Sequence, residues 1–105
     1  MNKPEHEFIV QSSASPVVEL SADGVYVWFQ PGRKASRTLV RSRWPVMAVD
    51  LDEDNEVIGI ECAPLPKTFS LQELGRKAGV LVPDMAAARA QIKPIADLKA
   101  ATASA

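Results

Sequence analysis

Regularly spaced acidic residues form the one stretch of this sequence whose side chains could surround an ion. Between residues 50 and 61, carboxylates occupy positions 1, 3, 5, 7 and 12 of a twelve-residue loop, and a valine stands at position 8. Calcium loops of the EF-hand type use this spacing because it places oxygen atoms around one cation. The residues concerned are Asp50, Asp52, Asp54, Glu56 and Glu61. Calcium binding is therefore one hypothesis for this stretch.

The residues that flank this stretch favour a strand hairpin over a calcium loop. An EF-hand has a helix on each side, whereas here Trp44-Pro45 precedes the stretch and residues 63–66 contain two prolines. Proline excludes regular helix at both junctions. Asn55 also stands where a calcium loop needs glycine, and no second loop is present to pair with the first. We therefore favour a solvated acidic hairpin tip.

Residues 46–62 alternate in the way that two antiparallel strands do. The apolar residues expected on one face of the first strand are Met47, Val49 and Leu51. Those expected on one face of the second strand are Ile58, Ile60 and Cys62. The connection at 52–55 is rich in residues that bond their own backbone, and Asn55 tolerates a positive φ. This pattern predicts an antiparallel hairpin.

The composition indicates one small domain. The chain has 105 residues, 47% of them hydrophobic, and a formal net charge of −1, which gives no general attraction to nucleic acid or membrane. No apolar run is long enough to span a bilayer, and no secretory signal is visible, so we expect a cytoplasmic protein. We expect a loose arm at 1–15, a single domain at 16–93 and a frayed or disordered tail at 94–105.

A second hairpin is predicted from residues 17–20 and 25–30, which are joined by the turn at 21–24. Both faces of the later strand are apolar, which is typical of a central strand covered on both sides. Together with the helices considered below, the hairpins predict an α+β fold, namely a small antiparallel meander with one or two short C-terminal helices.

A basic segment lies between the two hairpins, at residues 33–43. Its cations are Arg33, Lys34, Arg37, Arg41 and Arg43. They offer a site for an anion or for nucleic acid, but a strand that pairs with residues 46–52 and faces its carboxylates explains them equally. Because the chain as a whole is not basic, we favour the pairing.

Two helices are predicted near the C-terminus. Ser70 and Glu73 form a capping box for a helix that ends at Gly79, and Asp84 can cap a second helix from Met85 toward Ile92. The segment 70–93 also has the outline of a helix-turn-helix, which gives nucleic-acid binding a second route. The alternative is two small helices that cover one face of the sheet.

Residues 24–29 read GVYVWF, and residues 49–61 read VDLDEDNEVIGIE. This pair resembles a family of small β-rich bacterial domains of unknown function, whose members show D-x-L-Y-I followed by V-D-x-D-x-x-G-x-x-V-G-I-E. In this chain Asn55 stands where the family commonly has glycine, and more residues separate the two strands in the sequence. The resemblance covers about residues 17–63. It implies a compact antiparallel sheet without a known catalytic centre. Because such domains are often encoded near toxin-like proteins, it also implies an antitoxin-type partner role.

The sequence offers little for catalysis. His6 is the only histidine and lies in the expected arm, and the one cysteine, Cys62, falls in an apolar strand. We therefore expect no catalytic residues and no cofactor. An interaction module that forms a homodimer, and that binds a protein partner, fits better. Its expected anchors are Tyr26, Trp28 and Trp44, with core packing as the alternative for each.

Overall fold

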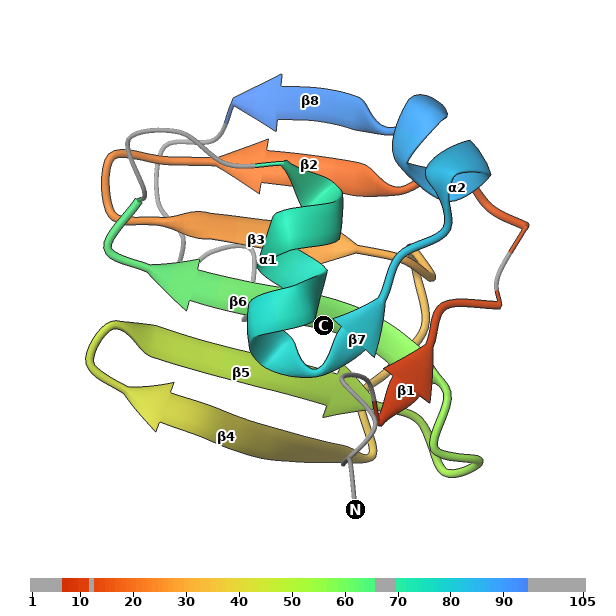
Figure 1. Cartoon of the computed structure of the whole chain (residues 1–105), viewed down its shortest axis with the longest axis horizontal. Helices are drawn as coiled ribbons and strands as arrows, with labels where there is room; N and C mark the ends of the chain where they lie inside the picture. The colour runs from red at the N-terminus through yellow and green to blue at the C-terminus, as the bar shows by residue number, and fades with distance from the viewer. Residues whose placement is uncertain (1–6, 12, 66–69, 95–105) are drawn as a thin grey trace, which may run out of the picture.

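A six-stranded sheet forms the frame of the fold. The structure is a computed structural model that describes residues 7–11, 13–65 and 70–94. Its elements are β1 (Phe8–Ile9), β2 (Val17–Leu20), β3 (Val25–Trp28), β4 (Arg37–Arg43), β5 (Val46–Leu51), β6 (Val57–Ala63), α1 (Leu71–Ala78), β7 (Val80–Leu81), α2 (Asp84–Ala88) and β8 (Gln91–Pro94). Helix α1 and the strand pair β1–β7 lie over one face of the sheet (Figure 1). We call this the helix side and the opposite one the second face.

The strand order is β4-β5-β6-β3-β2-β8. Strands β2 and β3 form one antiparallel hairpin, and β4, β5 and β6 form an antiparallel meander that joins it through β6 and β3. Strand β8 pairs with β2 in parallel, and β1 pairs with β7 in parallel. The expected α+β fold is thus confirmed as a β-rich, mostly antiparallel structure with two short helices. It is not one continuous meander, because the chain crosses from β3 to the far edge before it returns.

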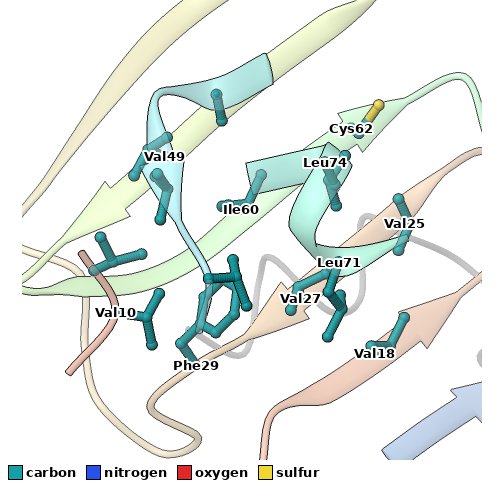
Figure 2. Packing of buried hydrophobic residues seen from close by; sticks show 14 of the residues in the cluster. Val10, Val18, Val25, Val27, Phe29, Val49, Ile60, Cys62, Leu71 and Leu74 are labelled. Carbon is teal, nitrogen blue, oxygen red and sulfur yellow. The ribbon is translucent and has the colours of Figure 1, made fainter. Parts of the chain in front are cut away.

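The main core lies between the sheet and α1. Leu71 and Leu74 project from α1 toward sheet residues such as Val27 and Ile60 (Figure 2). The alternation predicted for β5 is confirmed, since Met47, Val49 and Leu51 all belong to this cluster. Each fully buried aliphatic side chain of this kind stabilises the fold by roughly 1.5–3 kcal/mol. The core therefore holds α1 against the centre of the sheet.

A bulge in β6 overturns one predicted face. Asp50 is opposite Gly59, but Leu51 is opposite Val57, so Ile58 has no partner across the β5–β6 pair. The extra residue shifts the alternation by one position. Val57 consequently joins the main core, and Ile58 packs with two aromatic residues on the second face. The expectation that Ile58 shares a face with Ile60 was wrong for this reason.

Helix α1 begins and ends as the sequence predicts. The Ser70 hydroxyl oxygen accepts a hydrogen bond from the Glu73 amide at 3.1 Å, which satisfies one of the free donors of the first turn. Gly79 ends the helix with φ 80°, a left-handed conformation that glycine adopts without steric cost. These two local signals fix the length of the helix.

The second predicted helix is much shorter than expected. Helix α2 ends at Ala88, and residues 91–94 form β8 instead of continuing toward Ile92 as a helix. The Gln91 amide donates to the Pro16 carbonyl at 2.8 Å, and β8 then satisfies the backbone of β2, which would otherwise be an open edge. The apolar segment that would be the turn of a helix-turn-helix forms β7. The helix-turn-helix considered for residues 70–93 is therefore not formed.

The N-terminal residues that the structure describes are part of the fold. The Glu7 amide donates to the Gly79 carbonyl at 2.8 Å, and Val10 is buried in the main core. The expectation of a loose arm therefore fails for residues 7–10. His6 and residues 95–105 of the tail predicted at 94–105 lie outside the described residues, and Pro94 is the last residue of β8. Among the described residues, no helix has the length and apolar character needed to cross a membrane.

Close packing against Gly59 gives a test of the second face. A Cβ atom on this residue would lie 2.5 Å from Tyr26 Oη and 2.6 Å from Tyr26 Cε1. The Tyr26 side chain is fully buried. We expect Gly59→Ala to lower the free energy of unfolding by roughly 2–3 kcal/mol, because the ring has no room to move. Equilibrium unfolding in urea measures this change.

Gly32→Ala is the control for this prediction. Gly32 has φ +87° and no atom within 4 Å of an added Cβ, so only backbone strain of about 1 kcal/mol is expected there. Equal losses for the two variants would show that the Tyr26 ring can yield, contrary to the packing described.

Candidate functional site

The aromatic residues expected to anchor a partner have separate environments. Tyr26 and Trp28 are 1% and 7% exposed, and their ring centroids lie 4.6 Å apart on the second face, beside Ile58. Trp44, in contrast, is 79% exposed in the turn between β4 and β5. Of the three predicted anchors, only Trp44 is therefore presented to a partner by this chain.

Both buried aromatic residues donate hydrogen bonds to carboxylates. The Tyr26 hydroxyl donates to Asp50 Oδ2, and the Trp28 indole nitrogen donates to Glu19 Oε1. The Thr38 hydroxyl donates to the other oxygen of Asp50. Sequence analysis did not single out Thr38 or Glu19, although the cross-strand register that brings them there follows from strand pairing alone. These bonds satisfy the hydroxyl of Tyr26 and the indole N–H of Trp28, which are buried on the second face.

Burial shifts the pKa values of two groups of this cluster. Burial, followed by the hydrogen bond to Asp50, raises the pKa of Tyr26 above its ordinary value. Burial, followed by repulsion from Asp50, raises the pKa of Glu61. The tyrosine therefore remains a neutral donor that holds Asp50 in place.

The acidic turn is closed by a buried side chain. Asp52 Oδ1 accepts hydrogen bonds from the amides of Asp54 at 2.8 Å and Glu56 at 3.0 Å. Asp52 Oδ2 pairs with the Arg33 guanidinium at 3.0 Å. The bond from the Glu56 amide contributes most to lowering the pKa of Asp52, and Arg33 acts in the same direction. The expectation of a wholly solvated tip was thus wrong for Asp52, whereas Glu53 and Asp54 are exposed.

The five carboxylates with calcium-loop spacing do not converge. The side chains of Asp50 and Glu61 lie on the second face of the sheet, and the Asp52 side chain points into its own turn. Across 7–11, 13–65 and 70–94, no three His, Cys, Asp or Glu side chains are grouped so as to hold a metal ion. Strands flank the loop on both sides, so the helical frame of an EF-hand is not formed.

Three of the five basic residues are used within the chain. Arg33 pairs with Asp52, and both Nε and Nη2 of Arg37 donate to Asn55 Oδ1 at 3.1 and 2.7 Å. The third, Arg41, donates to the Ala78 carbonyl at 3.0 Å. The pairing of β4 with β5 that we favoured is confirmed. Lys34 and Arg43 are exposed and form no ion pair with another described residue.

Arg41 is the unpaired residue of a second bulge and acts as a structural tie. Its side chain also pairs with Glu7 at 3.1 Å and lies over the Phe8 ring at 5.7 Å. It thus connects β4 to β1 and to the C-terminal end of α1, where a cation is favourable. The bulge also shifts the register between Val40 and Ser42, so Arg37 and Arg43 lie on opposite faces of the sheet.

The four most exposed large apolar side chains lie at the two edges of the sheet. Among the described residues, the four large hydrophobic side chains with the greatest exposure are Trp44 (79%), Met85 (74%), Ile92 (68%) and Val40 (63%). Val40 lies on β4, and Trp44 follows it. Ile92 lies on β8, and Met85 belongs to α2, which leads into that strand (Figure 1). We call the pair Val40 and Trp44 the β4 surface, and the pair Met85 and Ile92 the β8 surface.

The sequence matches no protein-family model, no curated protein and no solved structure. The contacts and exposure of the chain's own residues therefore carry the functional proposal.

The tie formed by Arg41 can be tested against its neighbour on the same strand. We expect Arg41→Ala to lower the free energy of unfolding by about 1–2 kcal/mol, because a charged hydrogen bond to a carbonyl is lost. Amide exchange of residues 7–10 should accelerate. Arg43→Ala, which removes an exposed side chain, should change stability by less than about 0.5 kcal/mol. If both variants behaved alike, Arg41 would not hold β1 in place.

The turn carboxylate gives a pH-dependent prediction. We expect Asp52→Asn to be less stable than wild type at neutral pH, because an ionised acceptor paired with Arg33 is lost. Folding lowers the pKa of Asp52, so the ionised carboxylate contributes fully to the free energy of unfolding above its ordinary pKa of 3.8. This contribution disappears as the pH falls through the pKa of Asp52 in the folded state. The difference between the two proteins should therefore shrink in urea unfolding at about pH 2.5.

Asp54→Asn is the control for the pH experiment, because Asp54 lies in the same turn and its side chain is exposed. It should differ little from wild type throughout. A deficit of Asp52→Asn that stayed constant down to the lowest pH would contradict the charge-based explanation.

Proposed function

We propose that this protein is a non-enzymatic protein-interaction module that works as a homodimer. The observation that carries the proposal is the placement of the four most exposed large apolar side chains, two beside each open edge of the sheet. Exposed apolar surface next to an unpaired strand is costly in water and invites contact with another chain. Each edge can therefore serve as a docking surface.

The β8 surface suits a second copy of the chain. A two-fold axis at Ile92 would bring this residue against its own counterpart and place Gln91 opposite Lys93, with no like charges facing each other. An adjacent groove of about 410 Å³ on the helix side is lined by Leu20, Ala87 and other apolar groups. Because Pro94 has no amide hydrogen, backbone pairing here is short, and apolar contact must supply most of the affinity.

The polar residues of the described chain support a role in binding rather than in catalysis. Cys62 is buried, and burial raises the pKa of its thiol, which disfavours the reactive thiolate. The carboxylates of Asp50 and Asp52 are engaged by donors of the same chain. The resemblance over residues 17–63 implies an antitoxin-type partner role, which is consistent with a binding module.

Nucleic acid is the less favoured partner. Arg33, Arg37 and Arg41 all have partners within the chain, and the recognition helix that a helix-turn-helix requires is absent from the described residues. Binding to nucleic acid would also weaken steeply with salt, whereas association through apolar surface would not. Salt dependence therefore separates the two functions.

The homodimer can be tested by light scattering of the purified chain. We expect the wild type to have the mass of a dimer at about 100 µM, and Ile92→Lys to raise the dimer dissociation constant by about tenfold or more. A lysine at this position would bury a charge on the two-fold axis. A wild type that is monomeric at this concentration would refute the homodimer.

Val40→Lys is a matched control, since it makes the same kind of change on the opposite edge. It should leave the dimer intact. Dissociation by Val40→Lys but not by Ile92→Lys would move the dimer interface to the β4 surface.

A further inference from the structure

We infer that the open edge of β4 binds an acidic, extended segment of a different protein, which adds to the sheet as a further strand. This inference rests on the proposed function as an interaction module and names the partner of one of its two edges. Four features of the β4 region carry it: its open edge, its charge, its incompatibility with a second copy and the exposed tryptophan beside it.

The edge itself has the length that strand addition needs. Strand β4 spans Arg37–Arg43, seven residues, and among the described strands it pairs only with β5. Its outward N–H and C=O groups therefore have no sheet partner there. An added strand would satisfy these groups, and main-chain bonds of this kind supply much of the affinity in strand-addition complexes.

The charge of this region selects the partner. The sequence contains no aspartate or glutamate from Gly24 to Val49, whereas β4 alone carries three arginines. The described partner of Arg37 is a neutral amide, and Arg43 forms no ion pair with another described residue. Carboxylates on an incoming strand would pair with these two cations at the two ends of β4.

The same arginines disfavour a second copy at this edge. An antiparallel pair of β4 strands would bring three arginines of the second copy beside the three of the first. Like charges gathered along one strand pair destabilise it. The β4 edge thus rejects its own copy, and the acidic partner supplies the opposite charges that would make the pairing favourable.

The apolar residues of the β4 surface give the partner an anchor. Val40 offers an aliphatic contact near the middle of the strand, and Trp44 offers a large ring at its end. Tryptophan is the residue most often found to dominate binding energy at interfaces. Because the bulge at Arg41 leaves Arg37 and Arg43 on opposite faces, the partner segment carries acidic and aliphatic residues on both of its faces.

Fluorescence anisotropy with the full-length protein tests this inference. The probe is a labelled heptapeptide in which pairs of glutamates follow pairs of valines, so that both residue types appear on each face of the extended peptide. We expect saturable binding, and we expect Arg43→Glu and Trp44→Ala each to weaken it by about tenfold, a change equivalent to loss of one strong contact. Lys34→Glu reverses a charge on an exposed loop outside β4, so it is the control and should change binding by less than about twofold.

Two further probes distinguish strand addition from simple charge attraction. A heptapeptide of the same charge with its valines replaced by proline cannot donate the necessary amide hydrogens and should bind at least about tenfold more weakly. The same heptapeptide with lysine in place of glutamate should not bind. Equal binding of the valine and proline peptides would overturn the inference, because affinity would then come from charge alone.

The outcome for β4 is separable from the outcome for the dimer. If Ile92→Lys is monomeric and still binds the acidic peptide, both assignments hold. If the wild type is a dimer but binds no acidic peptide, the inference about β4 fails while the interaction module stands. If the protein binds a single-stranded oligonucleotide in an Arg43-dependent manner but not the peptide, the β4 region is a nucleic-acid site, and the inference is overturned.

Discussion

A buried carboxylate closes the turn between β5 and β6, the hairpin that joins the β4 edge of the sheet to its centre. Asp52 accepts amide hydrogens from its own turn and pairs with Arg33, which lies in the loop that carries the chain from β3 to β4. One side chain thus ties the β5–β6 hairpin to the crossing that precedes it. Because β6 then pairs with β3, the crossing leaves β4 at an open edge of the sheet.

The two faces of the sheet are stabilised by different means. On the helix side, aliphatic residues pack under α1, and their contribution follows the apolar area removed from water. On the second face, Tyr26 and Trp28 pack together, and their polar atoms are satisfied by Asp50 and Glu19. Burial without these acceptors would be costly, so the carboxylates are structural. Tyr26, Trp28 and their two carboxylate acceptors are therefore engaged within the chain.

The two edges differ in chemistry, and for this reason we propose a different partner for each. The β4 edge combines arginines with Val40 and Trp44, whereas the β8 edge is short and combines Ile92 with an apolar groove. An edge rich in arginines repels a second copy of itself. An apolar edge at which no like charges would face each other can pair with its own copy. One small sheet can therefore hold a second copy at one end and an acidic strand of another protein at the other.

The sequence by itself determined the features that depend on neighbouring residues. The apolar character of both faces of β3, the alternation of β5, the cap at Ser70 and the stop at Gly79 are local signals, and all four were predicted. Only the tertiary structure decided the bulge at Ile58, the conversion of residues 91–94 into β8 and the docking of β1 on β7. These features depend on which distant strand satisfies a backbone hydrogen bond, and periodicity within a segment carries no information about that choice. The exposure of side chains also depends on the tertiary structure. Trp28 and Trp44 are the same residue type, and the fold covers the first and leaves the second exposed.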